Sequence, residues 1–142
     1  MESALLGIVL DSGAIIAAER KKLDVAEFIG AIFEKHGSVD LSLSPVTIAE
    51  LVHGIYRAKT EQAAASRRAF VEELISLIPV HPMTARTACL AGTIEGQEAA
   101  KGNVIPLNDL LIAAAAIEQG YAVLTLNIRH FRQVPGLTVL SV

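Results

Sequence analysis

Three carboxylates and one amide occur at points of the sequence where an open parallel sheet would bring them together. Asp11 directly follows an apolar run that is predicted to be a strand, and Asn127 directly follows another. Glu50 lies early in the helix predicted after the second strand, and Asp109 opens a strongly apolar helix before the Asn127 strand. Ligands of open parallel sheets bind at the carboxyl ends of the strands. The four side chains are therefore expected to approach one crevice.

Side chains of this kind favour hard divalent cations. Carboxylate and amide oxygens suit Mg²⁺ or Mn²⁺ rather than zinc. Without an ion, three clustered carboxylates would repel one another and raise at least one pKa. Two divalent ions would add +4 to the −3 of Asp11, Glu50 and Asp109, so that a site that repels phosphate would bind it. Such ions activate water and stabilise the attacking and leaving oxygens of an in-line displacement, so the cluster predicts metal-dependent phosphodiester hydrolysis.

Each of the four residues could also have a purely structural role. Asp11 could cap a helix or form an Asx-turn, and Asp109 could favour its helix dipole or cap the first turn. Glu50 could form an exposed ion pair with Arg57, and Asn127 could be an ordinary turn residue. The functional interpretation is preferred because these structural roles would otherwise have to coincide at the same edge of one sheet.

The elements that must position these residues are predicted from apolar periodicity and from helix-ending glycines. Strands that are apolar on both faces alternate with helices, which is typical of a parallel sheet covered on both sides. We therefore expect one domain over residues 1–142, an open α/β/α sandwich with a mostly parallel central sheet. Strands are expected at residues 7–10, 39–43, 78–80, 122–126 and 137–140, and helices at 14–20, 25–35, 44–58, 61–77, 81–100 and 108–119.

The composition narrows the class of protein. An apolar fraction of 52% and a mean hydropathy of +0.48 exclude global disorder. The longest apolar run, residues 110–117, is far shorter than the roughly 20 residues that cross a bilayer as a helix. The N-terminus lacks the basic region of a signal peptide, and the single cysteine, Cys89, allows no internal disulfide. We expect a cytoplasmic protein without membrane contact.

The net charge indicates how the protein could interact with nucleic acid. A charge of −3 and a pI near 5.8 argue against a protein that coats nucleic acid by bulk charge. They do not exclude a nuclease, because bound divalent cations reverse the sign of an acidic pocket locally.

Four segments carry the residues discussed above in a fixed order and spacing. They are IVLDSGA (8–14), SPVTIAEL (44–51), IPLNDLLIAA (105–114) and LTLNIRHF (124–131), followed by the tail VPGL (134–137). Taken together, they resemble a PIN domain, specifically the VapC-type toxin ribonucleases of bacterial toxin–antitoxin pairs. The resemblance spans about residues 7–142, nearly the whole chain.

The resemblance implies roles for the acidic residues. Asp11, Glu50 and Asp109 match the three main acidic metal-site positions of the family. Asn127 stands where the family often has a fourth acid, and His130 stands where many relatives have another Asp. A neutral amide is a weaker ligand, so these two departures bear on whether a second metal ion is held. The structural alternative for His130 is a solvent-facing loop histidine.

Residues around the acids have supporting roles by the same resemblance. The hydroxyls of Ser12 and Thr125 are expected to orient the metal ligands, and Asn127 to hydrogen-bond a metal-bound water. For contact with RNA, Arg129 is close in sequence to the site. Further candidates for phosphate contact are Arg132, Arg57 two turns beyond Glu50, the run Arg20-Lys21-Lys22 and the pair Arg67-Arg68.

The resemblance also implies an activity and partners. It implies a Mg²⁺- or Mn²⁺-dependent endoribonuclease that acts on structured RNA of the tRNA or rRNA class. It implies a homodimer and a small VapB-type antitoxin whose C-terminal segment occupies the groove beside the active site. Two alternatives are a catalytically silent PIN module that binds a partner, which Asn127 favours, and a receiver-like signalling domain. A receiver would need an adjacent acidic pair after the first strand, where this chain has Asp11-Ser12-Gly13.

Overall fold

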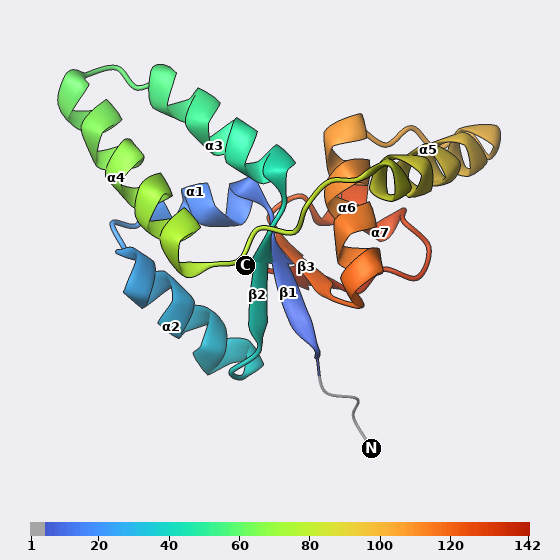
Figure 1. Ribbon diagram of the computed structural model, residues 1–142, viewed down its shortest axis with the longest axis horizontal. Coiled ribbons are helices and arrows are strands. Elements are labelled where there is room, and N and C mark those ends of the chain that lie inside the picture. The colour runs from blue at the N-terminus through green and yellow to red at the C-terminus, as the bar shows by residue number, and fades with distance from the viewer. Residues whose placement is uncertain (1–4) are drawn as a thin grey trace.

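A four-stranded parallel sheet forms the centre of the computed structural model, which describes residues 5–142 (Figure 1). Every pair of neighbouring strands is parallel, so all the carboxyl ends meet at one edge. Residues 1–4, on which part of the signal-peptide argument depends, lie outside the described residues. The strands are β1 (Gly7–Leu10), β2 (Asp40–Leu43), β3 (Ala122–Thr125) and β4 (Val139–Ser141), in the spatial order β2-β1-β3-β4.

Helices cover both faces of this sheet (Figure 1). The predicted α/β/α sandwich with a parallel sheet is therefore confirmed. Among the helices of residues 5–142, none combines the length and the apolar character that a membrane span requires. One face carries mainly α1 (Ser12–Arg20), α2 (Val25–His36), α3 (Pro45–Tyr56) and α4 (Glu61–Leu77), and the other carries α5 (Ala85–Ala100), α6 (Leu107–Gln119) and α7 (Ile128–Arg132).

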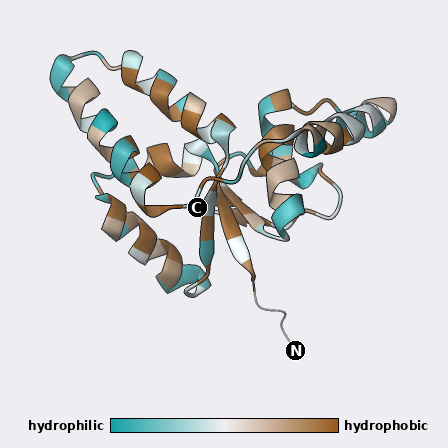
Figure 2. Ribbon diagram, in the orientation of Figure 1, coloured by the Kyte–Doolittle hydropathy of each residue, from teal (hydrophilic) through white to brown (hydrophobic). Residues whose placement is uncertain are grey.

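The central strand β1 is buried on both faces because successive side chains of a strand point in opposite directions. Ile8 and Leu10 belong to the core that β1 shares with α1, α2, α3 and α4. Val9 belongs to the second core, with α5, α6 and α7. Figure 2 shows the centre of the sheet in the brown of hydrophobic residues, while teal, hydrophilic residues are spread along the outward-reaching helices α4 and α5.

Two predictions near the middle of the chain are wrong: one concerns a strand and the other the start of a helix. The strand expected at residues 78–80 is reduced to a single bridge between Leu43 and Val80. Pro79 has no N–H to donate to a neighbouring strand, and its carbonyl accepts one bond from Leu43 (2.9 Å). The helix expected from residue 81 begins only at Ala85, because Thr84 forms the N-cap with a reciprocal hydrogen-bonded capping box.

The C-terminal region also differs from the prediction. The loop expected after Asn127 contains the short helix α7, which Phe131 fixes by being fully buried in the second core. The last strand starts two residues later than expected, at Val139, after a turn in which Gly136 has a φ of 76°. Helix α7 matters for function because it brings its side chains to the carboxyl edge of the sheet.

Gly120 and Gly96 test how a glycine at the end of a helix and one in its interior contribute to stability. Gly120 ends α6 with φ 71° and ψ 30°, a left-handed conformation that disfavours a side chain. We expect Gly120→Ala to cost roughly 1 kcal/mol and to lower the melting temperature by about 2–5 °C.

Gly96 is the control, since it lies exposed within α5 and a Cβ there would meet nothing within 4 Å. Gly96→Ala is expected to raise the free energy of unfolding by up to about 1 kcal/mol. Thermal unfolding followed by circular dichroism measures both. Shifts of the same sign in the two variants would contradict this assignment.

Candidate active site

Asp11 is both a helix cap and a member of the site. It follows β1 directly, and its Oδ1 accepts a hydrogen bond from the backbone N–H of Ser12 (2.9 Å), which starts α1. The hydroxyl of Thr125, at the end of β3, donates to Asp11 Oδ2 (2.7 Å). The residue is only 6% exposed. The structural and the functional roles are therefore compatible, because the cap fixes the carboxylate at the edge of the sheet.

Glu50 comes from α3 and is half-buried. Its Oε1 accepts a hydrogen bond from the Ser12 hydroxyl (3.1 Å), so the first residue of α1 connects two carboxylates. Within residues 5–142, Glu50 and Arg57 form no ion pair. The exposed pair considered as the structural alternative is therefore not present, and Glu50 turns toward Asp11 instead.

Asp109 lies in the first turn of α6 and contacts α7. His130 Nδ1 lies 2.7 Å from Asp109 Oδ2 and 2.9 Å from Asn127 Nδ2. An ionised carboxylate only accepts hydrogen bonds and an amide nitrogen only donates them, so Nδ1 donates to Asp109 when it carries a proton and accepts from Asn127 when it does not. The alternative of a solvent-facing loop histidine is wrong, since His130 is part of α7 and is held against a carboxylate.

The three carboxylates and Asn127 converge on one cavity of about 230 Å³, which we call the acidic pocket. Its lining residues are Asp11, Ser12, Gly13, Glu50, Asp109, Leu126 and Asn127. They come from the carboxyl ends of β1 and β3 and from the helices α1, α3 and α6. The convergence predicted from the sequence is therefore what the fold produces.

Not every residue selected from the sequence lines this pocket. Thr125 is fully buried behind Asp11, and its hydroxyl also accepts a bond from the backbone N–H of Asn127 (2.8 Å). The Arg129 side chain is exposed and forms no hydrogen bond or ion pair with the described residues. Asn108, which was not selected from the sequence as a site residue, has a side-chain amide that acts to lower the pKa of Glu50. Its position beside Asp109 was the one sequence signal for that role.

Burial and like charge act together on two of the carboxylates. Burial raises the pKa of Asp11 above its ordinary 3.8; the hydrogen bonds from Thr125 and Ser12 oppose this, and the charge of Asp109 adds to it. Burial likewise raises the pKa of Glu50 above 4.5; the bonds from Ser12 and Asn108 oppose this, and the charges of Asp11 and Asp109 add to it. The protein alone therefore disfavours full ionisation of the pocket.

The donors of the acidic pocket fit a hard cation by their chemistry. Three carboxylates from separate segments face one cavity, and their mutual repulsion is what a bound cation would relieve. Within residues 5–142, however, no three Asp, Glu, His or Cys side chains already stand at the spacing of a metal site. Their oxygens are engaged instead by Thr125, Ser12 and His130. An ion would therefore have to compete with these hydrogen bonds for the same oxygens.

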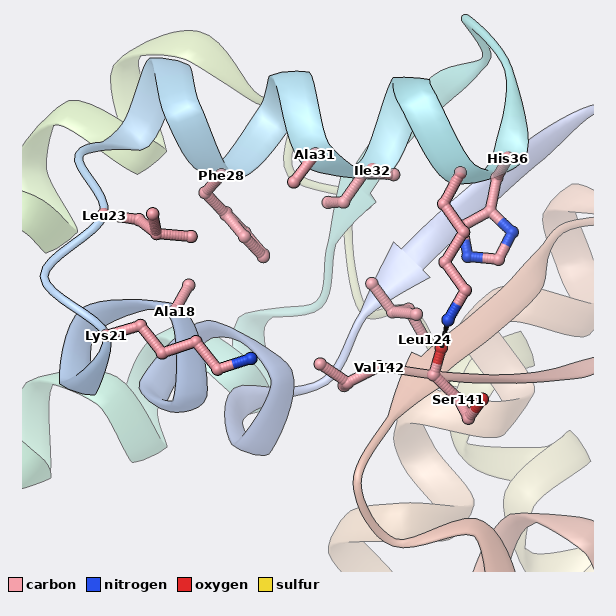
Figure 3. A pocket seen from close by; sticks show the side chains of 11 residues that line it. Ala18, Lys21, Leu23, Phe28, Ala31, Ile32, His36, Leu124, Ser141 and Val142 are labelled. Carbon is pink, nitrogen blue, oxygen red and sulfur yellow. Dashed lines mark hydrogen bonds between the residues drawn. The ribbon is translucent and has the colours of Figure 1, made fainter.

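A more apolar cavity lies elsewhere and holds no carboxylate side chain (Figure 3). It has about 180 Å³ and lies between α1, α2 and the C-terminal strand, with Phe28, Ile32 and Leu124 among its walls. Lys35 Nζ at its rim donates to the carbonyl of Ser141 (3.4 Å). The cavity's polar lining residues, among them His36 and Ser141, include no acidic side chain that could hold a divalent cation, so metal-dependent chemistry is assigned to the acidic pocket.

The comparison with protein families decides the classification. The family model described as "PIN domain" matches residues 8–137, a span that contains every residue of the acidic pocket. The chain belongs to the PIN domain family. The receiver-like alternative is thereby excluded.

Relatives of this PIN domain carry nuclease names. It is 31% identical over 137 residues to "Ribonuclease VapC1" of Rickettsia felis, covering 96% of this chain and 97% of the relative. It is 30% identical over 135 residues to "tRNA(fMet)-specific endonuclease VapC" of Salmonella typhimurium, covering 95% and 97%. The resemblance to VapC-type proteins and the assignment to the nuclease class of hydrolases are confirmed.

Solved structures agree with the PIN fold. The chain is similar to VapBC from Salmonella typhimurium in its DNA-bound form, with a TM-score of 0.80, 28% identity, and coverage of 96% of this chain and 98% of that chain. VapBC2 from Rickettsia felis, bound to a promoter DNA fragment, has a TM-score of 0.77 at 22% identity, with coverage of 95% and 98%, and supports the fold alone.

The raised pKa values predict how stability depends on pH. A carboxyl whose pKa is raised in the folded state contributes stability that is fully present below its unfolded pKa and is lost as the pH rises through its folded pKa. In metal-free buffer, the wild type should lose this contribution as the pH rises above the ordinary carboxyl pKa of about 4. Glu50→Gln should not lose its share, because glutamine stays neutral and still accepts the bond from Ser12.

Chemical unfolding at several pH values in EDTA measures this. Glu50→Gln should become more stable than the wild type as the pH approaches 7. Glu95→Gln, an exposed change on α5, is the control and should follow the wild type. A Glu50→Gln curve parallel to that of the wild type would show that Glu50 is not destabilised by burial and like charge.

The buried hydroxyl of Thr125 is expected to be essential for the shape of the site. Thr125→Val removes both of its hydrogen bonds at an almost constant volume and leaves buried polar groups unpaired, at a cost of about 1–3 kcal/mol. Thr125→Ser keeps the hydroxyl and should retain most of the free energy of unfolding measured in urea. A Thr125→Val variant as stable as the wild type, beside a clear loss in Thr125→Ser, would assign the effect to packing of the methyl group instead.

Proposed function

We propose that this PIN domain is a VapC-type endoribonuclease that hydrolyses phosphodiester bonds of structured RNA with Mg²⁺ or Mn²⁺. The observation that carries the proposal is the convergence of Asp11, Glu50 and Asp109, from three distant segments, on one solvent-accessible pocket at the carboxyl edge of the sheet. The names of the VapC relatives support the reaction class. The choice of metal follows from the oxygen donors of the pocket.

The protein's own residues prepare the pocket in three ways. Thr125 and the Ser12 N–H hold both oxygens of Asp11, and the Ser12 hydroxyl orients Glu50. With a proton on Nδ1, His130 donates to Asp109 and so orients its carboxylate. Asp11, Glu50 and Asp109 would hold the ion, with Asn127 as a neutral neighbour. When bound, a divalent cation supplies an activated water and positive charge for the phosphate oxygens.

Structured RNA of the tRNA or rRNA class is the substrate that the relatives suggest. The Salmonella relative is named as specific for tRNA(fMet). A pocket edged by the exposed residues Leu126 and Asn127 can accept a strand that continues beyond the scissile phosphate. We also propose that the protein is cytoplasmic, a location that is consistent with an RNA substrate.

A VapB-type antitoxin and a homodimer are the proposed protein partners. The DNA-bound Salmonella structure is of a VapBC complex, which supports an antitoxin partner. Exposed apolar side chains on this chain offer surface for such contacts: Val52 and Tyr56 on α3, Val104 and Leu107 before and in α6, and Leu126 beside the acidic pocket. Burial of these side chains in a complex would stabilise it.

The second candidate function is a silent PIN module that binds a partner without catalysis. It is favoured by one feature, the neutral Asn127 where relatives often have an acid. The two functions differ in a simple observation: only the enzyme cleaves RNA in a way that EDTA abolishes and Mg²⁺ restores.

Asp11→Asn is the decisive variant. Asparagine is also a good N-cap, so the fold should be kept, while the ion loses a charged ligand. We expect cleavage of a labelled tRNA transcript to fall at least about 100-fold, and the melting temperature without metal to be unchanged or raised. Glu95→Gln is the control and should cleave as the wild type does. Normal cleavage by Asp11→Asn would remove Asp11 from the mechanism.

Metal removal gives an independent test through ligand linkage. An ion that binds only the folded state adds about 2.7 kcal/mol to stability at 100 times its dissociation constant. Saturating Mg²⁺ should therefore raise the melting temperature of the wild type clearly and that of Asp11→Asn much less. Equal increases in both proteins would locate the ion away from the acidic pocket.

A further inference from the structure

Three arginines that are far apart in the sequence line one pocket at the seam of α1, α3 and α4. This arginine pocket, of about 200 Å³, holds Arg20, Arg57 and Arg67 with Glu19 over an apolar floor that includes Leu51. The three helices lie together on one side of the molecule (Figure 1). The spacing of these arginines along the chain does not predict that they come together.

The three arginines differ in how far they are engaged. Arg67 is fixed, because its Nη1 donates to the carbonyl of Gly54 (2.8 Å) and its Nε pairs with Glu19 Oε1 (3.3 Å). Arg20 and Arg57 are exposed and form no ion pair with any described residue. With one carboxylate against three guanidinium groups, the pocket keeps a net charge of +2 in a chain whose net charge is −3.

The arginine pocket continues the seam that begins at the acidic pocket. On α1, Ser12 and Arg20 are separated by about 12 Å along the helix axis. On α3, Glu50 and Arg57 are separated by about 10 Å. Asp11 caps the start of α1 and Glu50 lies in the middle of α3, whereas Arg20 and Arg57 lie at the C-terminal ends of these two helices. Arg20 and Arg57 also complement the dipoles at the C-termini of their own helices, but that explains neither their convergence with Arg67 nor the cavity between them.

We infer that the arginine pocket binds a phosphate of the RNA backbone beside the cleavage site, and that it does so without a divalent ion. The inference rests on the proposed function. A guanidinium group matches the oxygens of phosphate in a bidentate geometry. The lining has no aromatic ring on which a base could stack, so it would position the strand rather than read its sequence. A bound RNA would then be anchored close to the acidic pocket, which on its own repels it.

The test measures RNA binding apart from cleavage. A fluorescein-labelled tRNA transcript is titrated with the full-length protein in EDTA, and anisotropy is recorded at several salt concentrations. We expect the double variant Arg20→Gln/Arg57→Gln to bind at least about tenfold more weakly. Its log–log salt dependence should become shallower by about 1–2, since each lost phosphate contact removes about 0.7–1 from the slope.

Two further variants serve as controls. One keeps the positive charges of the arginine pocket, and the other removes a positive charge elsewhere on the surface. Arg20→Lys/Arg57→Lys keeps the charge and should keep the salt slope. Arg86→Gln removes an exposed arginine from the first turn of α5, away from the seam, and should bind as the wild type does. All variants should stay folded and melt within a few degrees of the wild type, because the changed side chains are exposed and the glutamine variant loses only the helix-dipole interactions of Arg20 and Arg57.

Each remaining outcome overturns one specific claim. If the double glutamine variant binds RNA with the wild-type affinity and slope while the wild type cleaves RNA in Mg²⁺, the subsite is wrong and the nuclease stands. If RNA binding is unchanged but a co-expressed antitoxin no longer binds the variant, the pocket belongs to an acidic protein segment and the inference is overturned. If the arginines carry RNA binding but the wild type never cleaves RNA, the proposed function fails and the subsite stands.

Discussion

Repulsion among three carboxylates is the constraint on which the functional edge of this protein depends. Like charges in a half-buried pocket are unfavourable, and the fold tolerates them because hydrogen bonds partly offset the repulsion. Thr125 and Ser12 donate to Asp11 and Glu50, and His130 faces Asp109. The repulsion is confined to a single cavity. A cation or cationic group that binds there would relieve it and so stabilise the folded protein.

The parallel sheet explains how that repulsion is concentrated. All neighbouring strands run in the same direction, so the residues that follow β1 and β3 reach the same edge. Helices then leave from that edge, and α3 and α6 bring Glu50 and Asp109 to it. The apolar strands contribute nothing chemical, yet their burial on both faces fixes the position of every acid.

The sequence was sufficient for the architecture and for the acids. Periodicity and strand-end position located Asp11 and Asn127 without any structure, because a short apolar run that stops at a polar residue marks the end of a buried strand in an α/β chain. The sequence was not sufficient to predict contacts between side chains that are far apart along the chain. The pairing of His130 with Asp109 depends on α7, which has five residues and is too short to show a helical period. The Glu50–Arg57 pair was plausible by spacing and does not form within the described residues, because Ser12 holds Glu50.

The bond between Thr125 and Asp11 joins residues that are 114 positions apart. A ribosome therefore exposes the first acid long before the strand that completes its surroundings has been made. Contacts between residues so far apart in the sequence form late in folding. The chain between the two residues must first close into a loop, which costs conformational entropy before the contact can stabilise the structure. During synthesis, the acidic pocket therefore stays incomplete until the segment that holds Thr125 and Asn127 has emerged.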